Sequence, residues 1–336
     1  MQQNYSLKQL NTFHIEAEAR WFQGFKEKDV LIDFLSGKLI DYPTYLILGG
    51  GSNVLFAGNF NGLVVHQDVR GKSIENEDEN FIYLRAQAGE DWDQLVEFAV
   101  NNGWGGLENL SLIPGRVGAC PIQNIGAYGV EVKDTILEVE YFDLRAKQTF
   151  SLKNENCKFG YRNSIFKNEL KGNVVILSVL FRLMKNPELN YAYITLQKEL
   201  KNVYPIDIRA IRDAVIRVRH HRLPDPNVLG NAGSFFKNPV ISEPHFHWLK
   251  KKFAEIPGFE TKDKQMKVPA AFLIETCGWK GKRMGQVGVH KQQPLVLINF
   301  GKGSGSDVLE LAEKIKKSVK TTFDIDLEME VNIVRS

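Results

Sequence analysis

Short hydrophobic runs alternate with polar positions along most of the chain, and amphipathic helices separate them. Three apolar stretches, Phe81–Ala86, Ile136–Phe142 and Val174–Leu183, are rich in β-branched and aromatic residues and are typical of strands. Helices are predicted at Asp29–Leu35 and Asp91–Asn101. Helices and strands that follow one another in this mixed order indicate an α+β protein.

A further helix is predicted from about residue 208 to just before Pro224, with four arginines opposite its apolar face. These arginines are Arg209, Arg212, Arg217 and Arg219. We interpret this face as solvated, because runs of charge usually cover exposed helix surfaces. The alternative is that the stretch from Arg219 to Arg222 binds phosphate.

The C-terminal part of the chain combines a capped helix with an alternating run. Ser304 and Asp307 have the spacing of a capping box before an amphipathic helix. Apolar and acidic residues then alternate from 323 to 333, which is typical of a strand. Glu328 and Glu330 share the polar face of this run, and periodicity does not choose between them.

Composition narrows the functional class. The 336 residues suffice for two or three domains, and a net charge of +3 gives no reason to expect nucleic acid. Cys120, Cys157 and Cys277 are odd in number and widely spaced, which fits neither disulfides nor a metal site and suits a reducing compartment. With no signal peptide and no apolar run of about 20 residues, we expect a cytoplasmic protein that does not insert into membranes.

Two glycine-rich stretches are the strongest candidates for a ligand site. Leu48–Phe56 contains Gly49-Gly50-Gly51-Ser52-Asn53, and Ile113–Gly129 contains four glycines. The first stretch matches neither a Walker nor a Rossmann fingerprint. Exposed backbone amides in such loops can bind anions, so two loops indicate a large phosphate-bearing ligand. A tight hairpin turn is the alternative for the first loop.

Two polar motifs carry candidate catalytic groups. Gly160–Ser164 contains Arg162, whose guanidinium can hold a carboxylate through two parallel hydrogen bonds. Asn231–Pro239 contains Ser234 outside any Gly-x-Ser-x-Gly frame, which favours proton donation over covalent attack. Each also has a structural alternative: a surface or ion-paired arginine, and a turn or helix-cap serine.

Together these motifs resemble the UDP-N-acetylenolpyruvoylglucosamine reductase family over nearly the whole chain. The resemblance also includes Leu223-Pro224-Asp225-Pro226, His290-Lys291-Gln292-Gln293 and Leu327-Glu328-Met329-Glu330-Val331. It implies an α+β fold with an FAD-binding domain of the vanillyl-alcohol-oxidase type, made of two subdomains, and a C-terminal α+β substrate-binding domain. The boundaries we expect are 1–70, 71–218 and 219–324, with a strand at about 325–336 that returns to the first subdomain.

The resemblance also implies noncovalent FAD, NADPH as the reductant, and UDP-N-acetylglucosamine enolpyruvate as the substrate. In the first loop, Gly49, Gly50, Gly51, Ser52 and Asn53 would hold the FAD diphosphate. In the second loop, the residues expected to line the flavin are Pro114, Gly115, Gly118, Ala119, Gln123, Asn124, Gly126 and Ala127.

By the same resemblance, Arg162 and Glu330 would stabilise the charge that develops on the substrate, and Ser234 would protonate it. The substrate contacts would come from Tyr128, Tyr191, Arg222 and Asn238, with Arg222 where the family has lysine. Tyr191 suggests the type with an extra tyrosine-bearing substrate loop. We expect a monomer.

Two other functions remain open at this point. The same fold could support an FAD-dependent oxidase or dehydrogenase that acts on another sugar or alcohol. The chain could instead be a nonenzymatic module that binds UDP-sugars without flavin.

Overall fold

A computed structural model describes residues 1–261 and 263–335. Backbone contacts divide the chain into two units, each assembled from separate stretches. The first contains 1–3, 21–50 and 62–221, and the second contains 4–20, 51–61 and the chain from 222 onward. The expected domain boundaries at 70, 218 and 324 stay predictions.

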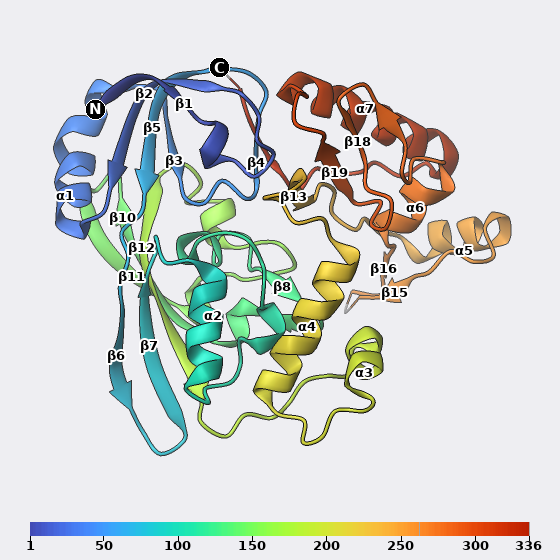
Figure 1. The fold of residues 1–336 in the computed structure, drawn as a ribbon, viewed down its shortest axis with the longest axis horizontal. Helices are drawn as coiled ribbons and strands as arrows, with labels where there is room; N and C mark the ends of the chain where they lie inside the picture. The colour runs from blue at the N-terminus through green and yellow to red at the C-terminus, as the bar shows by residue number, and fades with distance from the viewer. Residues whose placement is uncertain (262, 336) are drawn as a thin grey trace. The chain divides into compact units, whose positions relative to one another are not determined.

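A five-stranded antiparallel sheet forms the centre of the first unit (Figure 1). Its order is β11 (Gln148–Lys153), β10 (Ile136–Asp143), β12 (Val174–Met184), β7 (Phe81–Gln87) and β6 (Lys72–Glu77). The three strands predicted from apolar runs are β7, β10 and β12, so this prediction is confirmed. Apolar side chains on one face of these three strands form part of the buried core of this unit.

Helices cover this core. Asp91 caps α2 (Trp92–Asn101), because its side chain accepts hydrogen bonds from the backbone N–H groups of Asp93 and Gln94. Trp92 is 1% exposed and lies with its ring 6.1 Å from that of Phe181 on β12. A smaller core joins α3 (Ile194–Leu200) to α4 (Ile208–Arg222).

A second sheet in the order β1-β2-β5-β3 accompanies the N-terminal helix. Its strands are β1 (Gln2–Ser6), β2 (Glu18–Phe25), β5 (Phe60–Gln67) and β3 (Tyr45–Leu48), and the unit boundary falls within β1, β2 and β5. The predicted helix at 29–35 is α1 (Lys28–Asp33), which continues as a π-helical turn, Phe34–Lys38.

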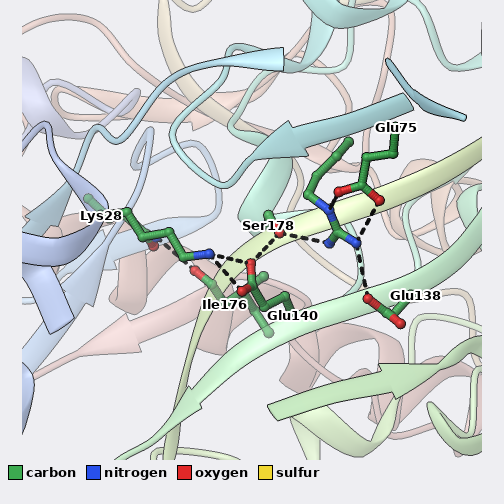
Figure 2. Close-up of polar contacts among 8 residues, drawn as sticks. Lys28, Glu75, Glu138, Glu140, Ile176 and Ser178 are labelled. Carbon is green, nitrogen blue, oxygen red and sulfur yellow. Dashed lines mark hydrogen bonds and ion pairs between the residues drawn. The ribbon is translucent and has the colours of Figure 1, made fainter. Parts of the chain in front are cut away.

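Polar side chains cross adjacent strands of the five-stranded sheet (Figure 2). Lys28 Nζ lies 2.6 Å from a carboxylate oxygen of Glu140, and Ser178 donates to Glu140 at 2.6 Å. Arg85 donates to the Ser178 hydroxyl at 3.0 Å and pairs with Glu75. Burial alone would raise the pKa of Glu140, but Lys28 and Ser178 outweigh it and lower this pKa. The cluster therefore joins α1 to the sheet through a charged carboxylate.

The described residues of the second unit include a four-stranded sheet, a three-stranded sheet, the β4–β20 pair and three α-helices. The four strands are β13 (Gly230–Ser234), β19 (Val296–Asn299), β18 (Val287–Val289) and β17 (Arg283–Met284). The other elements are β14 (Val240–Ile241), β16 (Met266–Lys267), β15 (Phe259–Glu260), α5 (Glu243–Lys252), α6 (Ala270–Thr276) and α7 (Gly305–Phe323). Ser304 and Asp307 form both bonds of the predicted capping box.

Two predictions about extended segments are wrong in part. The first glycine loop is no hairpin, because β3 pairs in parallel with β5, whereas β4 (Val54–Phe56) pairs in parallel with β20 (Asn332–Val334). The predicted C-terminal strand is also shorter than the alternating run. Ile325, Leu327 and Val331 are buried as the pattern requires, but regular pairing begins only at Asn332.

Candidate active site

The start of the first glycine-rich loop, up to Gly50, meets the second loop within the first unit. A Cβ atom added to Gly50 would lie 3.4 Å from Gly115 Cα and 3.4 Å from Arg116 Cγ. Gly115 has φ +137°, a backbone conformation that side chains disfavour. The two loops therefore lie at van der Waals distance, and the backbone conformation at Gly115 requires glycine.

Polar anchors fix these loops. Trp92 N–H, at the start of α2, donates to the Gly115 carbonyl at 3.1 Å. Arg116 lies 3.7 Å from Asp91 and 3.6 Å from Asp68. These contacts hold the second loop at the start of α2, where Gly115 and Asp91 accept from the first backbone N–H groups of the helix.

His66 supports the first loop, and sequence reasoning missed it. Its ring donates to the Gly49 backbone carbonyl and stacks on Phe22 with 5.9 Å between ring centroids. Burial lowers the pKa of His66, and the nearby Arg116 acts in the same direction although Asp68 opposes it. The ring is therefore held neutral beside the loop.

Left-handed backbone conformations cluster around the second loop. Asn124, Tyr128 and Arg162 have φ values of +46°, +49° and +51°. The Asn124 amide donates to Gly160 O at 3.0 Å and to a Glu131 carboxylate oxygen at 3.1 Å. This bridge joins the loop to the turn that carries Arg162. Such strain costs about 1–3 kcal/mol per residue and is typical of functional sites.

Two arginines approach each other in the same part of this unit. Arg162 donates to Gly126 O at 2.9 Å. Burial lowers the pKa of Arg219, an effect that Tyr128 and Asp93 counteract and Arg162 reinforces. Two half-buried guanidinium groups whose charges repel each other would together stabilise an anion bound near them.

The prediction of a fully solvated arginine face on α4 is wrong at two positions. Arg212 is 8% exposed and makes a two-point ion pair with Asp93 at 2.7 and 3.0 Å. Arg219 is half-buried, whereas Arg209 and Arg217 are exposed as predicted. Helix periodicity cannot reveal a partner 119 residues away.

Three other predicted segments meet in the second unit. Ser234 ends β13 after an irregularity in the pairing with β19, and Gly233 has φ +68° there. Glu330 N–H donates to Phe235 O at 2.8 Å, which places this glutamate beside the Ser234 segment. Asn53, from the first glycine loop, donates its side-chain amide to Glu330 O at 3.3 Å.

The structure distinguishes the two glutamates that the sequence left equivalent. The Glu328 side chain is 69% exposed and pairs with Lys237. Glu330 is half-buried, and the backbone on both sides of it is paired. Ser234 is likewise half-buried at a strand end, so it is not a helix cap.

The remaining predicted substrate residues have different environments. Tyr191 is 37% exposed on the irregular segment before α3, and Arg222 is exposed at the end of α4. The Asn238 side chain accepts a hydrogen bond from Ala270 N at 2.9 Å, so part of it supports the start of α6.

The residues present fit a dinucleotide flavin. Gly51 has φ +62°, and a Cβ there would lie 1.9 Å from Leu10 O. A Cβ on Gly118 would lie 2.7 Å from Ala88 Cβ. A side chain at either position would clash with neighbouring atoms, so each loop presents bare backbone there. Bare backbone amides suit a diphosphate and an extended cofactor.

Comparison with known proteins agrees with this site. The FAD binding domain model matches residues 43–148, and the model of the UDP-N-acetylenolpyruvoylglucosamine reductase C-terminal domain matches 225–334. Curated reductases of that name from Flavobacterium johnsoniae and Amoebophilus asiaticus are each 44% identical, over 99% and 100% of this chain and 99% of each relative.

A crystal structure of the Thermus caldophilus reductase has a similar fold, with a TM-score of 0.66 at 22% identity. The match covers 98% of this chain and 97% of that one. The expected α+β fold with an FAD-binding domain is confirmed. Among the described residues, no helix is both long and apolar enough to cross a membrane.

The curated relatives do not support the alternative of an oxidase for another sugar or alcohol. The chain belongs to the UDP-N-acetylenolpyruvoylglucosamine reductase family and is an oxidoreductase that uses FAD and NADPH.

Proposed function

We propose that this enzyme reduces the enolpyruvyl group of UDP-N-acetylglucosamine enolpyruvate to give UDP-N-acetylmuramate, a peptidoglycan precursor. One observation supports the assignment most strongly. The segments that carry Asn53, Ser234 and Glu330 lie side by side within the second unit. A diphosphate loop, a hydroxyl and a carboxylate are the groups that this reaction needs.

The reduction adds one hydride and one proton across a carbon–carbon double bond. When bound, the flavin supplies hydride-transfer chemistry, with NADPH as the source of electrons. The carbon next to the substrate carboxylate then carries negative charge, which the carboxylate shares as in an enolate. Fixed positive groups that face such charge lower the barrier.

Arg162 is the residue we assign to this charge, and Arg219 supports it. Arg162 is held by its bond to Gly126 and by a turn bridged through Asn124. Its guanidinium therefore needs little reorganisation when charge develops. Glu330 would fix the orientation of the neighbouring groups.

Ser234 would give its proton to the carbon that carries the charge, and solvent would restore that proton. A serine hydroxyl has a high pKa, so it is a useful donor only to a very basic acceptor, and an enolate is one. The half-buried strand end holds the hydroxyl in place.

Replacing Ser234 with alanine tests this role. In stopped-flow experiments, we expect flavin reduction by NADPH to be unchanged and reoxidation by the UDP-sugar to slow by ~10²–10⁴-fold. Ser242→Ala is the control, because Ser242 only caps α5. Loss of the NADPH half-reaction with normal reoxidation would show that the assigned role is wrong.

We further propose that the enzyme is a monomer in the bacterial cytoplasm, where NADPH is present and its three free cysteines would stay reduced. Light scattering coupled to size-exclusion chromatography tests the oligomeric state.

A further inference from the structure

The segment Asn190–Tyr193, here called the tyrosine segment, packs on the turn around Tyr128. The rings of Tyr128 and Tyr193 meet edge to face, with 5.5 Å between centroids. A Cβ added to Gly129 would lie 3.9 Å from the Asn190 side-chain nitrogen. The tyrosine segment itself has no helix or strand, and Tyr191 and Tyr193 are 37% and 49% exposed.

One buried amide joins these two pieces of chain. Asn109 is 1% exposed, and its Nδ2 donates to Asn190 O at 2.8 Å and to Tyr128 O at 3.2 Å. Both acceptors are carbonyl oxygens, which fixes the orientation of the amide. Asn109 thus uses both of its N–H groups to bridge segments that are far apart in the sequence.

The side-chain oxygen of Asn109 shows that an asparagine at this position has a cost. Asn109 Oδ1 is buried and has no hydrogen-bond partner among the residues that the structure describes. An unsatisfied buried acceptor is unfavourable, and each such group in a folded protein calls for an explanation. The two hydrogen bonds that Asn109 donates explain why asparagine is present despite this cost, because an apolar side chain of the same size could not make them.

We propose that Asn109 is a positioning residue that holds the tyrosine segment against Tyr128 before substrate binds. This inference rests on the proposed function and on the expectation, from the family resemblance, that Tyr191 and Tyr128 contact the UDP-sugar. A segment ordered in advance removes part of the ordering cost of binding. If the bridge is lost, the binding-competent fraction falls and the apparent affinity falls with it.

Asn109→Ala tests the proposal in the FAD-bound enzyme. We expect amide hydrogen exchange in residues 189–195 to accelerate about tenfold, and KM for the UDP-sugar to rise by about the same factor. We expect kcat, and the rate of flavin reduction by NADPH, to stay within about twofold. Asn109→Asp should have a larger effect, since it places a carboxylate against two carbonyl oxygens.

Asn154→Ala is the matched control. Asn154 Nδ2 also bridges two carbonyls, those of Lys133 and Ile136, each at 2.7 Å. The tyrosine segment takes no part in this bridge. The control should therefore leave exchange in the tyrosine segment and KM unchanged, even if it lowers stability by a comparable amount.

Unchanged exchange in the tyrosine segment of Asn109→Ala would overturn the proposal, and so would an equal rise in KM in Asn154→Ala. If Asn109→Ala does not fold, Tyr193→Ala removes the ring contact from an exposed position, and the same two readouts decide. The exchange measurement needs no substrate, so it separates failure of this inference from failure of the proposed function.

Discussion

Asp93→Asn should both destabilise the first unit and loosen the second glycine loop. Asp93 lies in the first turn of α2 and accepts two hydrogen bonds from Arg212 on α4, at 2.7 and 3.0 Å. It also accepts a bond from the N–H of Leu112 at 2.5 Å. Leu112 has φ +58° and directly precedes the second glycine loop, so one carboxylate fixes two helices and this loop.

The size of the effect follows from burial. The side chains of Arg212 and Asp93 are 9% and 26% exposed. Removing one partner of a buried ion pair typically costs about 3–5 kcal/mol, because a charge remains uncompensated. Since Asp93 is partly exposed, we expect about 3 kcal/mol, which in a unit of this size corresponds to a fall in Tm of roughly 6–12 °C.

Thermal and urea unfolding of wild type, Asp93→Asn, Arg212→Met and the double variant measure this coupling. The double variant should be more stable than Asp93→Asn, because it removes the unpaired buried charge. Glu169→Gln, which breaks an exposed pair with Lys158, should cost less than about 1 kcal/mol. A loss below about 1 kcal/mol in Asp93→Asn, with additive effects in the double variant, would refute the reasoning.

Two further predictions concern the first glycine loop. Gly51→Ala should abolish FAD retention or folding, because the added Cβ would lie 1.9 Å from Leu10 O and Gly51 has φ +62°. Flavin absorbance after gel filtration measures FAD retention. Normal flavin content in this variant would contradict the prediction. His66 has a lowered pKa, so the unfolded chain binds its proton first as pH falls. Stability should therefore be full above the ordinary value of 6.5 and decrease below it, and His66→Asn should lose less Tm between about pH 7.5 and pH 5.5 than wild type.

Elements with local signals were predictable from the sequence. The start of α2 depends on the Asp91 cap, and the start of α7 depends on Ser304 and Asp307, all within one turn of the helix they begin. The pairing of β3 and β4 was not predictable, because their partners β5 and β20 come from elsewhere in the chain. In the sequence, a glycine-rich turn between two apolar runs looks the same whether the two strands pair with each other or with strands from elsewhere in the chain.

In the candidate site too, features with a local sequence signal were predictable and contacts between distant segments were not. Its glycine loops and its motifs around Arg162 and Ser234 are visible in the sequence, and the family resemblance gives them roles that stay predictions. The functions of His66 and Asn109 were invisible, because each acts through a backbone carbonyl that only folding brings near. No pattern of residue types records such a bond.

The pairing of β4 with β20 sets an order for folding during synthesis. Asn332 donates to the backbone oxygen of Asn53, a residue made 279 positions earlier. At typical ribosome speeds, that interval is on the order of 15–60 s. The nascent protein must therefore keep the strand that follows its first glycine loop unpaired until residues 332–334 have been made, and a chaperone that binds exposed strand edges would act there.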